Sequence, residues 1–171
     1  MKVALVTGGS SGIGKAVVTR LSQMRYRVVA CSRNKQSLEQ LQNELSGQGH
    51  PIHIHPIDLQ IEESITTCFS DTYQKLGPLN LLINCAGIGY DEPLIDGSAT
   101  RWRTMVEINI LGLCMCTKEA LLYMSDSDDY GHIVNISSLS GHRIGPDGGL
   151  YSATKFAVTA ITETLRRELV A

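Results

Sequence analysis

The sequence has no uninterrupted apolar run of the roughly 18 or more residues that are needed to cross a bilayer. We also expect no cleavable signal sequence, because Met1 leads straight into a short strand-like run. The five cysteines are an odd number without CxxC spacing, which argues against a disulfide framework and against a zinc site. We therefore expect a cytoplasmic protein with buried thiols, no membrane span and no bound metal.

Acidic residues are absent from the first 38 positions, which carry seven of the 15 Lys and Arg residues of the chain. All 17 Asp and Glu residues follow later, and the formal net charge is −2. This balance excludes a generally basic nucleic-acid binder, so we expect no nucleic-acid partner. The N-terminal part is instead suited to meet an anion.

Short β-branched runs alternate with amphipathic segments of helical length, which is typical of repeated βαβ units around a parallel sheet. At 171 residues, 43% of them hydrophobic, the chain fits a single domain, residues 1–171, of the α/β class. Two longer helices are predicted at 98–124 and 151–169. The predicted strands are 3–6, 27–30, 52–57, 79–83 and 132–136.

The run IHIH at 52–55 lies between Pro51 and Pro56. Proline and polar side chains suit an edge strand, which has a neighbour on one side only. His53 and His55 share a face of that strand, so they could ligate a metal. We expect them to be solvated instead, because the sequence places no third ligand.

The segment TGGSSGIG at 7–14 follows the first predicted strand and leads into a helix. Glycines permit a sharp turn and a close approach of the backbone to a ligand, and the helix N-terminus offers unpaired N–H groups. A merely flexible turn is the alternative, but the position between strand and helix favours a pyrophosphate site. The candidate ligands are Thr7, Gly8, Ser10, Ser11, Gly12, Ile13 and Gly14.

The spacing TGxxxGxG near the start of a chain resembles the short-chain dehydrogenase/reductase family. The resemblance implies a Rossmann-like, doubly wound sheet with strand order 3-2-1-4-5. An NAD site places an acid at the end of the second strand, whereas an NADP site places Arg there. This strand ends in Ser32, Arg33 and Asn34, with no acid before Glu39, so we expect NADP(H).

Further cofactor contacts are implied by the same resemblance. The family's acid after the third strand, which recognises the adenine, matches Asp58 with Leu59. Its NNAG segment matches residues 84–87, with Cys85 in place of the second Asn. Asn84, Ala86 and Gly87 are therefore expected beside the cofactor.

Tyr151 and Lys155 in YSATK stand four residues apart, one turn along the same helix face. A nearby cation favours the phenolate form of a phenol, so this pair can act as an acid or base. The family's active-site signature adds a serine, which matches Ser138, with Ser137 as the adjacent alternative. Its helix asparagine matches Asn109, which the family uses as an anchor for a water linked to the lysine.

The resemblance implies hydride transfer between the nicotinamide and a carbonyl or alcohol carbon. Ser138 would bind the substrate oxygen, Tyr151 would transfer its proton, and Lys155 would hold the nicotinamide ribose. The segments 111–120, 138–143 and 157–163 look like the subgroup with family member 11 and the insect farnesol dehydrogenases. That subgroup acts on steroid, prenoid or other lipophilic substrates. We expect residues 141–150 to line the opening of the substrate pocket.

The family domain continues beyond residue 171 with a nicotinamide-contacting segment, a substrate lid and its last strands. We therefore expect a fragment or a shortened isoform, with an incomplete C-terminus. Two functions stay open: an NADP(H)-dependent oxidoreductase, and a non-catalytic NADP-binding or interaction protein. The two long helices form a subunit interface in the family, so a homodimer or homotetramer is expected.

Overall fold

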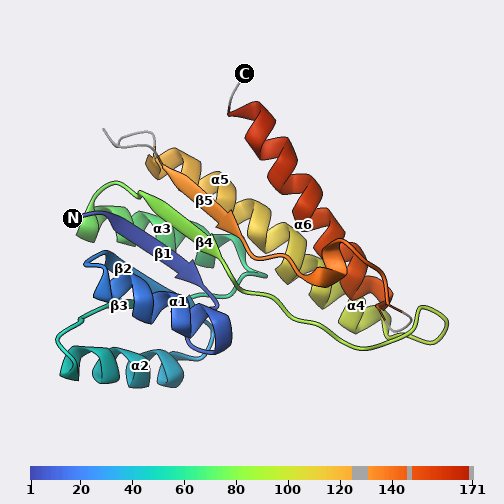
Figure 1. The fold of residues 1–171 in the computed structure, drawn as a ribbon, viewed down its shortest axis with the longest axis horizontal. Coiled ribbons are helices and arrows are strands. Elements are labelled where there is room, and N and C mark those ends of the chain that lie inside the picture. Colours follow the sequence, from blue (N-terminus) through green and yellow to red (C-terminus); the bar gives the residue numbers. More distant parts are fainter. Residues whose placement is uncertain (125–130, 146–147, 170–171) are drawn as a thin grey trace.

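A computed structural model describes residues 1–124, 131–145 and 148–169 of the chain. Within them, five parallel strands form one sheet with the order β3-β2-β1-β4-β5, which confirms the expected Rossmann-like topology (Figure 1). The strands are β1 (Val3–Thr7), β2 (Arg27–Ser32), β3 (His53–Pro56), β4 (Leu81–Asn84) and β5 (His132–Asn135). The helices are α1 (Gly12–Gln23), α2 (Lys35–Gly47), α3 (Glu62–Leu76), α4 (Ala99–Val106), α5 (Leu113–Met124) and α6 (Gly149–Glu168).

Strand β1 lies in the middle of the sheet, and all five of its residues are buried. A strand that is covered on both faces is apolar throughout, as VALVT is here. Strand β3 is at one edge of the sheet, as the flanking prolines and the histidines predicted. The sheet thus places the glycine turn after β1 at the centre of the carboxyl edge, where open α/β sheets bind ligands.

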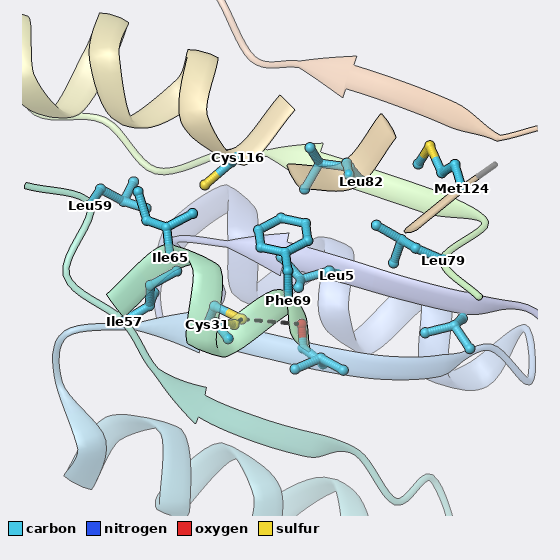
Figure 2. Packing of buried hydrophobic residues seen from close by; sticks show 14 of the residues in the cluster. Leu5, Cys31, Ile57, Leu59, Ile65, Phe69, Leu79, Leu82, Cys116 and Met124 are labelled. Atoms are coloured by element: carbon cyan, nitrogen blue, oxygen red, sulfur yellow. Dashed lines mark hydrogen bonds between the residues drawn. The ribbon is translucent and has the colours of Figure 1, made fainter. Parts of the chain in front are cut away.

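Two hydrophobic clusters cover the two faces of the sheet. On one face, Leu5 and Leu82 pack against Phe69 of α3, together with residues of α5 (Figure 2). On the other face, Val6 packs against side chains of α1 and α2, among them Val18. Alternate residues of β1 therefore serve opposite cores, as the period of a strand requires.

The long helix that was predicted over 98–124 is interrupted by a π-helical turn, η1 (Glu107–Gly112), between α4 and α5. Asn109 lies in this turn and is only 2% exposed. Single π turns within α-helices frequently occur at functional sites. Asn109, a polar residue that suits the interior of an ordinary helix poorly, thus lies where the α-helical hydrogen-bonding pattern gives way to the π-helical one.

The edge strand differs from the prediction in one respect. His55 is not simply solvated, because its side chain is 21% exposed and its Nε2 lies 3.4 Å from Asp71 Oδ2 of α3. Among the described residues, no group of three or more His, Cys, Asp or Glu side chains is placed to hold a metal ion.

Candidate active site

The glycine turn after β1 is tightly packed. Gly8 has a φ of +68°, a left-handed conformation that favours glycine, and a Cβ there would lie 2.8 Å from Ala86 Cα. A Cβ on Gly14 would lie 2.2 Å from the carbonyl oxygen of Gly8. The Gly9 N–H donates to the carbonyl of Cys31 at 2.9 Å, which ties the turn to β2. Side chains at these positions would collide with the backbone and force the turn to move.

Helix α1 begins within this turn and has no acidic residue in its first turn. Its N-cap, Ser11, makes no capping hydrogen bond through its side chain. The N–H groups at this end therefore remain available, and the positive end of the helix dipole favours an anion. The physical requirements for a phosphate site are present at the predicted place.

Two cavities, of about 280 and 470 Å³, meet at this turn. Gly8, Ser11, Ala86, Gly87 and Ile88 line both cavities. The two cavities thus adjoin along the carboxyl edge of the sheet, and we refer to them together as the cleft. Its two ends hold different sets of side chains.

At one end of the cleft lie the residues predicted to recognise the adenosine. Ser32, Arg33 and Asn34 line this end, together with Asp58 and Leu59. Arg33 is exposed and, among the described residues, has no ion-pair partner. Arg33 is thus an unneutralised cation at the end of β2, as the sequence predicted, and Asp58 is the carboxylate that lines the same end of the cleft.

Two of the predicted ligands have a different position. The hydroxyl of Thr7 is buried and accepts the backbone N–H groups of Cys85 and Ala86 at 3.1 and 3.2 Å. The amide of Asn84 is also buried and donates to Thr117 and to Asn135. Neither side chain lines the cleft, so both residues hold the strands β1, β4 and β5 together around it.

Tyr151 and Lys155 lie at the other end of the cleft. The Lys155 Nζ is 5.9 Å from the centroid of the Tyr151 ring, and it donates to the carbonyl of Ile136 at 2.9 Å. Lys155 is 6% exposed, and this burial lowers its pKa from the ordinary value of 10.5. The structure therefore brings the predicted phenol and ammonium group to the same space as the glycine turn.

Asn109 connects the π turn with the floor of the cleft. Its Oδ1 accepts the N–H of Ile88 at 2.9 Å, and its Nδ2 donates to the carbonyl of Ile88 at 2.8 Å and to the hydroxyl of Thr154 at 3.0 Å. A Cβ on Gly87 would lie 3.4 Å from both Asn109 Oδ1 and Lys155 Nζ. The asparagine thus fixes the segment after β4 against α6.

The two serines after β5 differ in how their hydroxyl groups are used. Ser137 lines the cleft, and its hydroxyl donates to the carbonyl of Lys155 at 3.0 Å. The Ser138 hydroxyl accepts the N–H of Ser140 at 3.1 Å, at the start of the short 3-10 helix η2 (Leu139–Gly141). In the part of the chain that the structure describes, Ser138 therefore keeps its own O–H proton for a further acceptor.

Several contributors to the site were not predicted. Thr154 stands in the quoted motif, but only the structure shows that it binds Asn109. Ile88 and Ile136 contribute through their backbone groups, which leave no side-chain signal in a sequence. Of the expected pocket opening at 141–150, Pro146 and Asp147 lie outside the described residues.

A parallel sheet of this order, with a glycine turn and a free helix N-terminus at the centre of its carboxyl edge, defines a Rossmann-like, nucleotide-binding type of fold. The family model described as short chain dehydrogenase matches residues 2–171. The chain therefore belongs to the short-chain dehydrogenase/reductase family of oxidoreductases.

Two similar proteins are named as dehydrogenases. The chain is 43% identical to a dehydrogenase/reductase SDR family member 11 from Gallus gallus, over 98% of the chain and 68% of that protein. It is 38% identical to the farnesol dehydrogenase of Aedes aegypti, over 98% and 70% of the two chains. It thus spans about two thirds of the length of these relatives.

A solved structure shares the architecture as well. It is an alcohol dehydrogenase from Thermococcus sibiricus in complex with 5-hydroxy-NADP, with a TM-score of 0.92 at 30% identity. The match covers 98% of this chain and 71% of that one. Among the described residues, no helix is both long enough and apolar enough to span a membrane.

Proposed function

We propose that this chain binds NADP(H) and transfers a hydride between its nicotinamide and a carbonyl or alcohol carbon. One observation carries the proposal: the glycine turn and the Tyr151–Lys155 pair, which are far apart in the sequence, line the same cavity of the cleft. A bound dinucleotide could therefore reach from the phosphate site to the phenol. This activity is proposed for the protein as a whole and not for the described residues alone.

The residues of the cleft fit the proposed cofactor. The turn packs so closely that a Cβ on Gly8 or Gly14 would collide with backbone atoms, and the first residues of α1, with their N–H groups, line the cleft. The pyrophosphate would lie against residues 8–14, with Asp58 and Leu59 beside the adenine. Lys155 would hold the ribose next to the nicotinamide.

The proposed chemistry assigns each polar group one task. Bound NADPH supplies the hydride and carries the redox chemistry. The free O–H of Ser138 donates to the substrate oxygen, and Tyr151 gives that oxygen a proton in reduction or takes it in oxidation. The positive charge of Lys155 stabilises the negative charge that develops on the phenol oxygen, and Asn109 holds the segment at Ile88 in place.

Replacing Tyr151 by phenylalanine tests this assignment. The exchange removes the proton donor and leaves the rest of the cleft unchanged, so turnover of NADPH with a lipophilic ketone should fall by about 10²–10⁴-fold. The affinity for NADPH, measured by its fluorescence on titration, should stay within about twofold of the unmodified chain. Tyr26→Phe, outside the cleft lining, is the matched control.

The same assay separates the two functions that the sequence left open. Near-normal turnover in Tyr151→Phe would refute the role of the phenol. If the unmodified chain binds NADPH but oxidises none of it with any ketone or aldehyde, the non-catalytic binding function describes this chain instead.

The preference for NADP(H) over NAD(H) rests on the end of β2. Ser32 and Arg33 line the cleft there, Arg33 has no ion-pair partner within the described ranges, and Glu39 is paired with Lys35 at 3.7 Å. Exchanging Ser32 for Asp should shift the ratio of kcat/KM for NADPH and NADH by about tenfold to a hundredfold toward NADH, because the new carboxylate repels a 2′-phosphate. Gln36→Asp adds the same charge outside the cleft lining; an unchanged ratio in the Ser32 variant would remove this site from the proposal.

A lipophilic substrate is the finer part of the proposal. A third cavity of about 560 Å³ lies beside the first turns of α6, next to Tyr151 in the sequence. Its lining is mainly apolar and includes Leu94, Ile144 and Phe156. The Aedes aegypti relative is named for farnesol, an apolar alcohol, which agrees with such a lining.

Assembly into a homodimer or homotetramer also belongs to the proposal. Leu122 of α5, which is 57% exposed, would be covered in such an assembly.

A further inference from the structure

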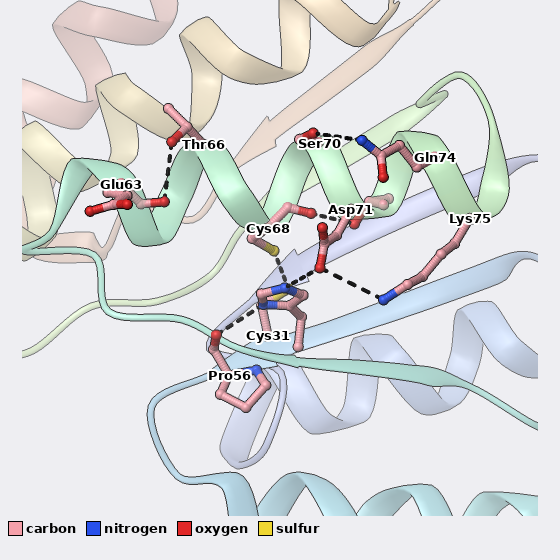
Figure 3. Close-up of polar contacts among 11 residues, drawn as sticks. Cys31, Pro56, Glu63, Thr66, Cys68, Ser70, Asp71, Gln74 and Lys75 are labelled. Atoms are coloured by element: carbon pink, nitrogen blue, oxygen red, sulfur yellow. Dashed lines mark hydrogen bonds and ion pairs between the residues drawn. The ribbon is translucent and has the colours of Figure 1, made fainter.

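Two thiols and an imidazole lie together between β2, β3 and α3, outside the lining of the cleft. Cys31 of β2 and Cys68 of α3 are both 0% exposed, and their Sγ atoms are 3.5 Å apart. Figure 3 shows the two cysteines between β2 and α3, with Asp71 one helical turn beyond Cys68. Cys31 and His55 are register partners on neighbouring strands, which brings the histidine to the same place.

The imidazole of His55 is held by three groups. One ring nitrogen, Nδ1, donates to the carbonyl of Pro56 at 2.9 Å. The other, Nε2, lies 3.4 Å from Asp71 Oδ2, and His55 also forms a hydrogen bond with Cys68. The hydrogen bond with Cys68 is the main cause that raises the pKa of His55 to about 9. The His55 imidazole thus favours its protonated form beside the Cys68 sulfur.

The two thiols are not equivalent. Hydrogen bonding from Cys31, supported by His55, holds the pKa of Cys68 below its ordinary value, although burial acts in the opposite direction. The same hydrogen bond raises the pKa of Cys31 well above its ordinary value. Of the two thiols, Cys68 is thus the one that loses its proton more readily, and Cys31 the one that keeps it. A further charged neighbour, Lys75, pairs with Asp71 at 3.7 Å. A third thiol nearby, Cys116, is buried, and this burial raises its pKa.

A small opening leads toward this group. A cavity of about 140 Å³ is lined by His55, Asp71, Thr72 and Lys75, among others. The side chain of His55 is 21% exposed. The cavity reaches His55, the neighbour of Cys68, whereas the two cysteines themselves are 0% exposed and are shielded from large reagents.

We propose that Cys31 and Cys68 form a peroxide-sensitive dithiol, whose oxidation to a disulfide weakens the binding of NADP(H) at the adenosine end of the cleft. This site lies outside the proposed hydride-transfer chemistry. Its effect on the cofactor rests on the proposed function, whereas the formation of the disulfide does not.

The oxidation proceeds in two balanced steps. The Cys68 thiolate attacks one peroxide oxygen, so that an S–O bond forms, the O–O bond breaks, and the leaving hydroxide takes a proton from His55 and becomes water. The sulfur of Cys31 then attacks the resulting sulfenic acid: the S–S bond forms, the S–O bond breaks, and a second water leaves with the proton of the Cys31 thiol. Two thiols lose two electrons in total, and one peroxide is reduced to two waters.

The cleft is coupled to this pair through the backbone of Cys31. Its carbonyl accepts the N–H of Gly9 at 2.9 Å, and the next two residues, Ser32 and Arg33, line the cleft. A disulfide requires about 2.05 Å between sulfurs that are now 3.5 Å apart, and we expect its formation to draw β2 and α3 toward each other. This movement draws the end of β2 away from the glycine turn and from the position of a 2′-phosphate.

The first experiment treats the reduced chain with hydrogen peroxide and maps its disulfides by mass spectrometry after alkylation of the free thiols. We expect a peptide pair linked through Cys31 and Cys68, the loss of two of the five thiols, and full reversal by dithiothreitol. His55→Gln should slow the reaction about tenfold, because the thiolate loses its cation. Cys114→Ser, a half-buried cysteine on α5, should oxidise at the unmodified rate.

Absence of the Cys31–Cys68 link, or an unchanged rate in His55→Gln, would overturn the dithiol site. Mapping the unmodified chain needs no variant, so this result does not depend on whether a substituted chain folds.

The second experiment measures NADPH affinity before oxidation, after it, and after reduction. We expect a loss of about tenfold that dithiothreitol restores and that Cys68→Ala does not show. An unchanged affinity in the disulfide form would overturn the coupling. If the reduced chain itself does not bind NADPH, the failure belongs to the proposed function, and the disulfide map alone then decides the dithiol site.

Discussion

Exchanging Gly14 for alanine perturbs the cradle of the cleft at one backbone contact. The added methyl group would lie 2.2 Å from the Gly8 carbonyl oxygen and 2.7 Å from its carbon, whereas real contacts of this kind are at least 3.0 Å. No side chain can rotate away, because both opposing atoms belong to the backbone. The turn at Gly8 must therefore move, at a cost of about 1–3 kcal/mol.

Urea unfolding, followed by circular dichroism, measures this cost directly. With a slope of about 1–3 kcal/mol per molar urea, the midpoint should fall by about 1 M. NADPH affinity should fall by about tenfold or more, since the displaced turn no longer directs its N–H groups to one point, and 1.4 kcal/mol corresponds to a factor of about ten.

Gly47→Ala is the matched control, because a Cβ at the last residue of α2 meets no atom within 4 Å. We expect this variant to be unchanged or stabilised by up to about 1 kcal/mol. A Gly14→Ala chain that unfolds at the unmodified midpoint and keeps its NADPH affinity would refute the argument from close backbone packing.

Two further predictions concern buried polar groups. Thr7→Val keeps the shape of the side chain but leaves the N–H groups of Cys85 and Ala86 without their acceptor. The free energy of unfolding in urea should therefore fall by about 2–4 kcal/mol. The control Thr67→Val, on the exposed side of α3, should change it by less than about 0.5 kcal/mol. For Lys155, burial lowers the pKa in the folded state, so the unfolded chain binds more protons in the pH range just below the ordinary value of 10.5, and stability should rise with pH across that range. Lys155→Met should lack this rise when unfolding is compared at pH values on both sides of the range, and an equal rise in both chains would contradict the assignment.

Much of the fold follows from local patterns, because strand and helix periods are written in neighbouring residues. The apolar run of β1, the prolines around β3 and the glycine spacing at 7–14 each reflect a local requirement for burial, an edge position or a tight turn. For the same reason, the pairing of Tyr151 with Lys155 could be predicted, since a spacing of four residues places both on one helix face.

Long-range contacts account for what the patterns missed. Thr7 and Asn84 stand in the right motifs, but hydrogen bonds to partners at least 33 residues away direct their side chains into the protein and not into the cleft. The resemblance favoured Ser138 over its neighbour Ser137 as the catalytic serine, and the acceptor that binds the Ser137 hydroxyl, the carbonyl of Lys155, is a contact that only packing supplies. Cys31, His55 and Cys68 come from three different elements with no common motif. Spacing along the chain carries no information on such a meeting, because it arises only when the register of β2 and β3 and the packing of α3 are both set.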